Sequence, residues 1–293
     1  MPEPAGLRQK QTIRCGGLAL AARRAPLVMG ILNVTPDSFS DGGDFIDPGA
    51  ASRRALDMER EGADVIDIGG ESSRPGAERI PARVESERVL PVVRELAAKL
   101  TVPMSIDTCR PEVAAAALDA GCRMVNDVTA CRHPEMPDVL QHYDVPVVLM
   151  HMLGDPDSMQ AAPSYDDVVE EVFSYLRERV EFLTGRGIAG ERVIVDPGIG
   201  FGKRFRDNLD LLGSATRFYD LGHPLLIGAS RKRFLGELLR APAAGRLTGS
   251  LAVAARCYQM DVDMVRVHDV KETVELFRVL DAMDRPGEYR ADW

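Results

Sequence analysis

The feature that most constrains this chain is a pattern that repeats eight times along it. Each repeat has a short apolar run, a polar or glycine-containing end, and then a segment rich in Ala, Leu, Arg and Glu. Short apolar runs bounded by turn residues are typical of strands buried on both faces of a parallel sheet. The predicted strands are residues 28–34, 64–69, 103–108, 124–128, 147–152, 193–198, 225–230 and 264–269.

Helices are predicted between most of these strands. Apolar residues recur there at spacings of three and four, which is the period of an amphipathic helix. The predicted helices are residues 50–61, 83–99, 110–120, 166–186, 207–219, 247–259 and 271–283, with a shorter piece within 133–142. Eight strands alternating with helices, at a mean repeat of about 34 residues, predict an α/β fold of the (β/α)₈ TIM-barrel type. A doubly wound open sheet is the alternative.

Three regions are predicted along the chain. Residues 1–27 form a polar lead and a small β-hairpin, in which two apolar triplets flank Gly16 and Gly17 and which we expect to lie under the sheet. Residues 28–284 form the barrel domain. Residues 285–293 form a C-terminal tail that contains Pro286 and Gly287.

Composition excludes several classes of partner. The chain has 293 residues, a formal charge of −9 and a pI of about 5.2, so neither nucleic acid nor an anionic membrane is an expected partner. The five cysteines are odd in number and show no Cys-x-x-Cys spacing, which indicates reduced thiols in a cytoplasmic protein. We find no signal peptide and no apolar run long enough to span a membrane.

Polar side chains stand at the carboxyl end of every predicted strand, which is where the active site of such a barrel lies. They include Asn33, Asp67, Asp107, Asn126, His151, Asp196, Lys232 and His268. One set of donors would suit a phosphate ester or a diphosphate. Its members are Asn33, Arg74, Lys203, Lys232, Arg266 and His268. A second set, Asp107, Asn126 and Asp196, would suit the N–H groups of a heterocycle.

Several of these features also have simpler explanations. Asp127 and Asp269 are equally explained as helix caps. The polar loop that carries Phe39 and Asp41 is either a lid or an ordinary connection. The glycine-rich segment 196–203 lacks the spacing of a nucleotide-binding loop, so we expect it to pass close to a flat ligand.

The side chains in and near the predicted strand 147–152 are more typical of the lining of a pocket than of a metal centre. Met150, Met152 and Met159 are interpreted as core and pocket lining, because methionines at such spacings are more often packed than metal-bound. His151 is interpreted as a hydrogen-bonded wall and not as a base.

Eight short motifs, in order, resemble those of the bacterial dihydropteroate synthase family. They are NVTPDSFSDGG, GGESSRPGA, SIDT, NDV, MHM, DPGIGFGK, SRK and RVHDV. The resemblance implies condensation of (7,8-dihydropterin-6-yl)methyl diphosphate with p-aminobenzoate to 7,8-dihydropteroate and diphosphate. It also implies Mg²⁺ as cofactor and a homodimer.

The same resemblance implies a role for individual residues. The pterin would be bound by Asp107, Asn126, Met150, Asp196, Phe201 and Lys232. The diphosphate would be bound by Ser73, Arg266 and His268, with Asn33 on the metal. The p-aminobenzoate would be bound by Phe39, Arg74, Pro75 and Lys232. The catalytic residues would be Asp41, Asp107, Asp196 and Lys232.

Two positions depart from the family pattern, and two other functions stay open. Ser73 stands where many members have Thr, and Arg233 stands where some have Ser, which leaves open how the benzoate carboxylate is held. One alternative is a paralogue that binds pterin without turnover. The other is a pterin-dependent methyltransferase domain that passes a methyl group from a folate to a corrinoid protein.

Overall fold

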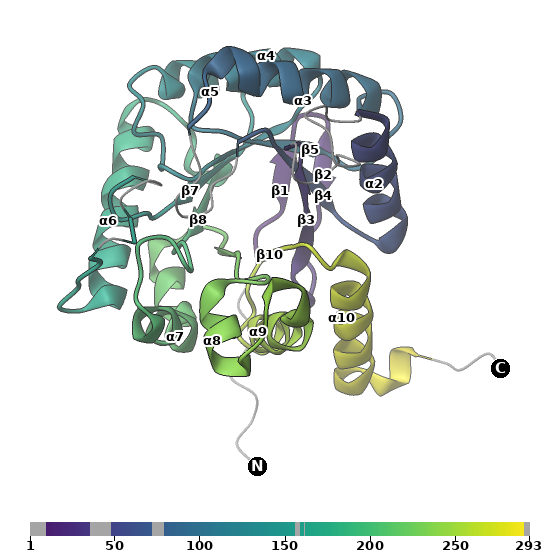
Figure 1. Ribbon diagram of the computed structural model, residues 1–293, viewed down its shortest axis with the longest axis vertical. Helices are drawn as coiled ribbons and strands as arrows, with labels where there is room; N and C mark the ends of the chain where they lie inside the picture. Colours follow the sequence, from purple (N-terminus) through teal and green to yellow (C-terminus); the bar gives the residue numbers. More distant parts are fainter. Residues whose placement is uncertain (1–9, 36–47, 72–78, 156–158, 161, 290–293) are drawn as a thin grey trace.

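Eight parallel strands form a nearly closed barrel in the computed structural model of this chain, which describes residues 10–35, 48–71, 79–155, 159, 160 and 162–289 (Figure 1). The strands are β3 (Leu27–Asn33), β4 (Val65–Gly69), β5 (Met104–Asp107), β6 (Met124–Asp127), β7 (Val147–Met150), β8 (Val193–Asp196), β9 (Leu226–Ile227) and β10 (Met264–Val267). Their order is β8-β7-β6-β5-β4-β3-β10-β9, and a bridge between Val195 and Leu225 brings the two end strands together. The predicted TIM barrel is therefore confirmed.

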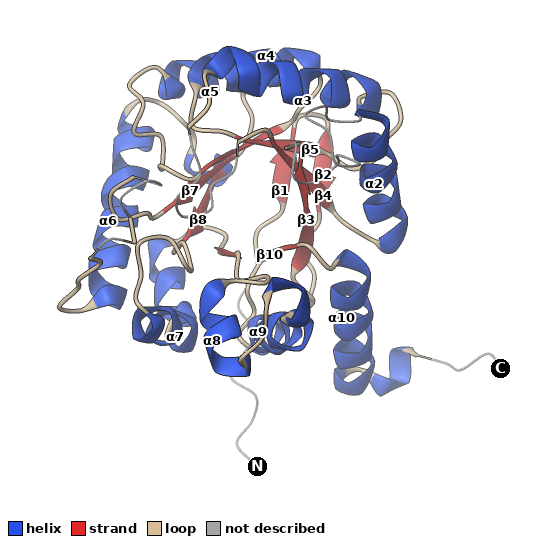
Figure 2. Ribbon diagram, in the orientation of Figure 1, coloured by secondary structure: helices blue, strands red, loops and turns tan. Residues whose placement is uncertain are grey.

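Helices surround the strands as an outer layer (Figure 2). They are α2 (Pro48–Glu61), α3 (Ala82–Leu96), α4 (Pro111–Ala120), α5 (Met136–Tyr143), α6 (Val168–Gly185), α7 (Phe205–Gly213), α8 (Arg233–Leu239), α9 (Leu247–Gln259) and α10 (Val270–Asp284). The start of α6 follows from its sequence, because the Asp167 side chain accepts hydrogen bonds from the backbone N–H groups of Val169 and Glu170. Within the described residues, no helix combines the length and the apolar character needed to cross a membrane.

The structure departs from the predicted elements in the last third of the barrel. The helix predicted at 207–219 is two pieces, α7 and a 3₁₀ helix at Ala215–Leu221, because Gly213 and Ser214 interrupt it. Helix α8 was not predicted, since Gly236 lies in the middle of a segment of only seven residues. The guanidinium of Arg246 lies close over Gly236, at 2.4 Å from where a Cβ atom would stand, so a larger residue there would displace the arginine side chain.

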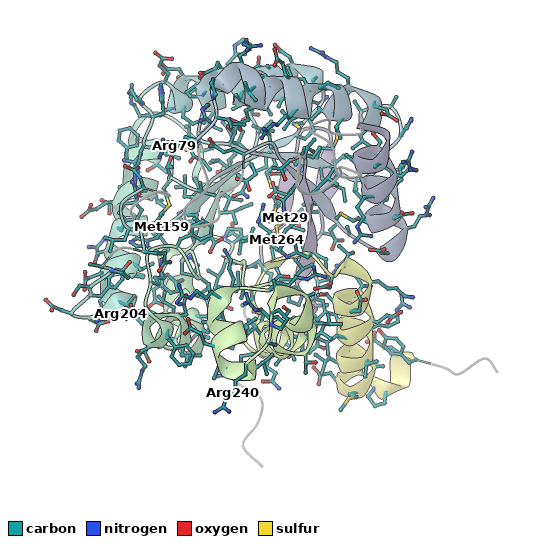
Figure 3. The ribbon with its side chains drawn as sticks, in the orientation of Figure 1. Met29, Arg79, Met159, Arg204, Arg240 and Met264 are labelled. Atoms are coloured by element: carbon teal, nitrogen blue, oxygen red, sulfur yellow. The ribbon has the colours of Figure 1, made fainter. Side chains whose placement is uncertain are left out.

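Two apolar cores lie on either side of the strands. The larger packs the outer faces of the strands against the helices, as in other barrels. The smaller fills the amino-terminal end of the barrel interior, where Met29 and Met264 lie (Figure 3). The antiparallel hairpin of β1 (Ile13–Cys15) and β2 (Leu18–Leu20) adds Ile13, Cys15 and Leu20 to this inner core. The hairpin therefore closes the end of the barrel opposite to the predicted site.

This closure predicts that Ile13, which is only 1% exposed, contributes to the stability of the whole barrel. We expect Ile13→Ala to lower the free energy of unfolding by ~2–5 kcal/mol, because it leaves a cavity in the inner core. Leu18→Ala on the same hairpin is the matched control, since Leu18 is 43% exposed and should change stability by less than about 0.5 kcal/mol. Urea titration followed by circular dichroism measures both. Equal effects of the two substitutions would contradict the closing role.

Candidate active site

Arg266 of β10 joins acidic side chains from two other strands at the carboxyl end of the barrel. Its Nε donates to Asp67 Oδ2 at 2.6 Å, and its Nη2 donates to Asp107 Oδ2 at 2.7 Å. Asn126 Nδ2 donates to the same Asp67 oxygen at 2.9 Å. Strands β4, β5, β6 and β10 thus bring one cation, two carboxylates and an amide into one cluster. The predicted acidic and basic sets are not separate groups, because Arg266 is bonded to the acids.

Asp67 is the fully buried member of this cluster. A buried carboxylate is strongly unfavourable unless it is paired and hydrogen-bonded, and Asp67 satisfies this only through Arg266 and Asn126. Its second oxygen, Oδ1, has no hydrogen-bond partner among the described residues, and the same holds for Ser105 Oγ on the neighbouring strand. Asp67 was predicted as a strand-end polar group but belongs to neither of the two predicted binding sets. The sequence does indicate that Asp67 needs a partner, because an acid inside the apolar run 64–69 has to be paired when the strand is buried.

Asp107 and Asp196 are the two other acids of the site. Burial raises the pKa of Asp107, and the nearby charge of Arg266 opposes that rise. Burial also raises the pKa of Asp196, to about 6, against a hydrogen bond from the Gly198 backbone N–H and the charges of lysines nearby. That N–H lies 2.7 Å from Asp196 Oδ1. Gly198 has a φ of +69°, and a Cβ atom would lie 1.9 Å from the His151 carbonyl oxygen, so only glycine fits.

Lys232 stands just before α8 and places its ammonium group over an aromatic ring. Its Nζ lies 3.9 Å from the centroid of the Phe201 ring, which is a cation–π contact. Burial lowers the pKa of Lys232 to about 8, helped by the charge of Arg266 and opposed by Asp196 and Asp107. Lys232 therefore lies within the electric field of Asp107, one of the two acids that bind Arg266.

An apolar wall closes one side of the cluster. Met150, Met152, Met159 and Phe201 are buried together, and Val128 packs against them. The interpretation of these methionines as core residues is confirmed, and their role as pocket lining stays a prediction.

The structure overturns one expectation in this region, because Lys203 does not offer its charge to a ligand. It is 3% exposed, and its Nζ lies 2.9 Å from His151 Nδ1 and 3.0 Å from the Phe201 carbonyl oxygen. Burial lowers the pKa of Lys203 to about 7 and that of His151 to about 2. The pair joins the loops that follow β7 and β8. The interpretation of His151 as a hydrogen-bonded wall agrees with this geometry.

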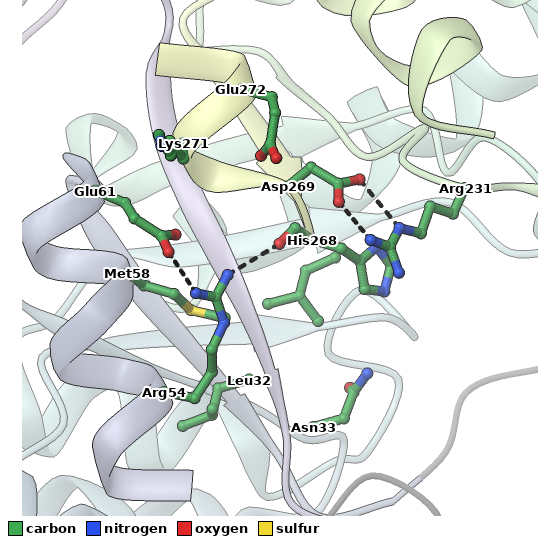
Figure 4. Close-up of a pocket in the computed structure, with 11 residues that line it drawn as sticks. Leu32, Asn33, Arg54, Met58, Glu61, Arg231, His268, Asp269, Lys271 and Glu272 are labelled. Carbon is green, nitrogen blue, oxygen red and sulfur yellow. Dashed lines mark hydrogen bonds and ion pairs between the residues drawn. The ribbon is translucent and has the colours of Figure 1, made fainter. Parts of the chain in front are cut away.

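A cavity of about 460 Å³ lies at the end of β3, against α2 and the start of α10, and its lining does not include Arg266, Asp67, Asp107 or Asn126 (Figure 4). Asn33 and His268 line it, together with Arg231 and Asp269, which form an ion pair with a 3.0 Å contact between Nε and Oδ2. The side chain of Asp269 pairs with Arg231 and makes no cap contact with α10, so the cap interpretation of Asp269 is wrong. Arg231 was not predicted to be part of the site.

Asp127 caps no helix of the described residues, so the cap interpretation is also wrong for it, and its carboxylate holds a local turn instead. Its carboxylate accepts from Thr129 N, Thr129 Oγ1 and Cys131 N. These bonds hold the turn after β6, where Ala130 and Cys131 have positive φ angles. The carboxylate of Asp127 therefore makes its hydrogen bonds within the turn that follows it.

Asn33 is the predicted ligand of a magnesium ion. Within the described residues, no three His, Cys, Asp or Glu side chains are grouped so that they could hold a metal. Mg²⁺ is commonly bound through one or two protein oxygens, substrate phosphates and water, so a single amide oxygen at the cavity wall fits a metal that arrives with a phosphorylated substrate. It does not fit a metal held by the protein alone.

Five predicted site residues lie outside the described part of the chain. They are Phe39, Asp41, Ser73, Arg74 and Pro75. The described residues that flank the second of these segments are firmly held, because Arg110 bonds both oxygens of Glu71 at 3.0 Å and Glu71 accepts from Ile80 N at 2.8 Å.

Comparison with known proteins agrees with the motif resemblance. Residues 29–268 match the family described as pterin binding enzyme. Dihydropteroate synthase of Escherichia coli strain K12 is 45% identical over 257 residues, which is 88% of this chain and 91% of that protein.

Solved structures of dihydropteroate synthases share the fold of this chain. The Xanthomonas albilineans dihydropteroate synthase with 4-aminobenzoic acid has a TM-score of 0.88 and 46% identity, covering 93% of this chain and 98% of that one. The same enzyme in complex with 7,8-dihydropteroate has a TM-score of 0.85 and 44% identity, covering 94% of this chain and 99% of that one. This chain therefore belongs to the pterin-binding enzymes and, among them, to the dihydropteroate synthase family.

Proposed function

We propose that this chain condenses (7,8-dihydropterin-6-yl)methyl diphosphate with p-aminobenzoate, giving 7,8-dihydropteroate and diphosphate in folate biosynthesis. The observation that carries the proposal is the cluster of Arg266, Asp67, Asp107 and Asn126 at the carboxyl end of the barrel, with Asp196 and Lys232 nearby. The related Xanthomonas albilineans enzyme has been solved with 4-aminobenzoic acid and with 7,8-dihydropteroate, which supports both the second substrate and the product.

The pterin is bound in this proposal by Asp107, Asn126, Asp196 and Lys232, with Met150 and Phe201 as its apolar wall. Asn126 donates its Nδ2 to Asp67, which leaves its carbonyl oxygen to accept from an N–H of the ring. Asp196 uses Oδ1 for the Gly198 N–H, so Oδ2 is the oxygen available to the ligand. The oxygens of the two acids would match the fork of N–H donors on an amino-pyrimidinone edge.

The diphosphate is bound in this proposal by Arg266, His268 and Ser73. Arg266 uses Nε and Nη2 for Asp67 and Asp107, so Nη1 is the nitrogen left to a phosphate oxygen. Asn33 would hold Mg²⁺ at the cavity wall. When bound, the ion would neutralise negative charge on the diphosphate.

The reaction proceeds in the proposal by an SN1-like mechanism. The bond between the pterin methylene carbon and the diphosphate oxygen breaks first, and both electrons leave with the diphosphate. Arg266 and His268 stabilise the charge that develops on it. Asp107 and Asp196 stabilise the cation left on the pterin, and the amine of p-aminobenzoate then attacks the carbon and loses a proton. No residue needs to act as a covalent nucleophile.

The p-aminobenzoate is bound in this proposal by Phe39, Arg74, Pro75 and Lys232, and Asp41 belongs to the catalytic set. For all but Lys232 the proposal rests on the motifs alone. Arg233, the first residue of α8, replaces the Ser of some relatives and exposes a second cation beside Lys232. It pairs with Glu237 at 2.9 Å, so its charge is already partly balanced.

Three further assignments complete the proposal. The chain divides into the lead and hairpin of 1–27, the barrel of 28–284 and the tail of 285–293.

A homodimer would use α9 and α10, since Val279 and Met283 of α10 are 58% and 71% exposed. A cytoplasmic location agrees with five cysteines that are all free thiols.

The first test is release of diphosphate from the two purified substrates. We expect stoichiometric release that depends on both substrates and on added Mg²⁺, with dihydropteroate formed in equal amount. A pterin-binding paralogue without turnover would bind the pterin diphosphate and release nothing. A methyltransferase domain would instead require a methylated folate and a corrinoid acceptor.

The second test concerns Asp196. Because its carboxylate is proposed to bind the ring while charged, Asp196→Asn should weaken pterin affinity by ~1.5–3 kcal/mol, about 10- to 150-fold. Since burial raises the pKa of Asp196 to about 6, the charged form is present above that pH, and wild-type affinity should fall as the pH drops through it. The variant should lose this pH dependence.

Asp210→Asn on the exposed side of α7 is the control. Titration calorimetry that shows wild-type affinity and pH dependence in Asp196→Asn would remove this residue from the site.

A further inference from the structure

Ser230 makes two hydrogen bonds to His268, and together they determine where the histidine carries its proton. The Ser230 hydroxyl oxygen accepts from the His268 backbone N–H at 3.2 Å. The same hydroxyl oxygen lies 3.0 Å from the Nδ1 atom of the His268 ring. Ser230 is 6% exposed, so water has little access to the hydroxyl.

The hydroxyl has one hydrogen to donate, and only one acceptor is in place for it. Among the described residues, Ser230 Oγ has no hydrogen-bond partner other than the two atoms of His268. The backbone N–H can only donate, so the hydroxyl hydrogen is directed to Nδ1. Nδ1 is then an acceptor without a proton, and the proton of the neutral ring is on Nε2.

The other ring nitrogen of His268 is Nε2. His268 lines the 460 Å³ cavity, and within the described part of the chain Nε2 has no hydrogen-bond partner (Figure 4). We propose that Ser230 is a positioning residue that fixes His268 as the Nε2–H tautomer and so presents a neutral N–H donor to the cavity. That the acceptor is the departing diphosphate rests on the proposed function above.

The surrounding contacts hold Ser230 and His268 in place relative to each other. Arg231 and Asp269, the residues that follow Ser230 and His268, form an ion pair between the same two loops. The Arg231 backbone N–H donates to Ser250 Oγ at 2.9 Å, and Arg231 has a φ of +55°, an uncommon conformation for a residue with a side chain. Burial, together with the charges of Arg266 and Arg231, lowers the pKa of His268 to about 3, which agrees with a neutral ring.

A neutral N–H donor suits the proposed chemistry. A donor that is neutral in the free enzyme can bind an oxyanion without adding a third cation to Arg266 and Arg231 in the same small space. The same nitrogen unprotonated would present a lone pair to a diphosphate and repel it. The tautomer therefore decides whether His268 attracts or opposes the ligand.

The experiment is long-range proton–nitrogen NMR of the full chain with ¹⁵N-labelled histidine. His268 is one of five histidines, and its signals are assigned by their loss in His268→Gln. We expect the wild type to show an unprotonated Nδ1 and a protonated Nε2. In Ser230→Ala the two nitrogen shifts should move toward each other as the tautomers mix, and Ser230→Thr, which keeps a hydroxyl, should restore the wild-type pattern. A proton on Nδ1 in the wild type, or an unchanged pattern in Ser230→Ala, would overturn the proposal.

Ser250→Ala is the matched control for loss of a hydroxyl in the same region. Ser250 holds the Arg231 backbone but makes no contact with the His268 ring, so the tautomer should not change. In kinetics, Ser230→Ala should lower kcat/KM for the pterin diphosphate by about 2- to 12-fold, the loss expected for one hydrogen bond. The kinetic loss should be absent in Ser230→Thr. A tautomer shift of equal size in Ser250→Ala would also overturn the proposal, because it would trace the effect to the loop and not to the Ser230 hydroxyl.

Addition of inorganic diphosphate with Mg²⁺ separates the tautomer from the proposed function. A shift of the Nε2 signal on addition places the diphosphate at this donor. If the wild type has the Nε2–H tautomer but its signal does not respond, the role of Ser230 is upheld and the diphosphate role of His268 is overturned.

Discussion

The site depends on the sharing of one guanidinium between the fully buried carboxylate of Asp67 and the partly buried carboxylate of Asp107. Arg266 binds Asp67 at 2.6 Å and Asp107 at 2.7 Å, and so connects β10 with β4 and β5 across the carboxyl end of the barrel. Asp67 could not remain buried and charged without Arg266, because an unpaired charge in a protein interior costs several kcal/mol. Asp67 has no exposed surface at all, and its place in the cluster is structural. In the proposed function, Asp67 holds the cation while Asp107 and Asn126 keep oxygens for a ligand.

Burial moves the pKa values of Asp196 and Lys232 toward neutral pH. It raises the pKa of Asp196 to about 6 and lowers that of Lys232 to about 8, so each group is less firmly charged than in water. Acids of this kind respond strongly to positive charge that develops on a ligand, because the low dielectric of the interior strengthens the interaction. The apolar wall of Met150 and Phe201 maintains that environment. A reaction that separates a cation from a diphosphate is therefore suited to this end of the barrel.

The fold could be predicted from the sequence because strands buried on both faces are apolar runs that end abruptly, as at Asn33 and Asp107. The meeting of polar groups at the carboxyl end of the barrel could be predicted because the strands end in such groups. Partners within the site could not be predicted. Lys203 had the residue type of a phosphate ligand, but the turn after β8 buries it against His151. Asp67 was predicted only as a polar group at a strand end, because its partner Arg266 lies on β10, 199 residues away in the sequence, and only the folded barrel brings the two together. Helix α8 contains a glycine, and tertiary contacts override its low helix propensity.

A crystal structure of this chain with a dihydropterin and inorganic diphosphate is the most direct test of the account. The account predicts that the pterin ring contacts Asp107, Asn126 and Asp196 against Phe201, and that a diphosphate oxygen lies within hydrogen-bond distance of both Arg266 and His268. Asp67 should still bind Arg266 in that complex. Ligands bound away from this cluster, or a diphosphate that contacts neither Arg266 nor His268, would contradict it.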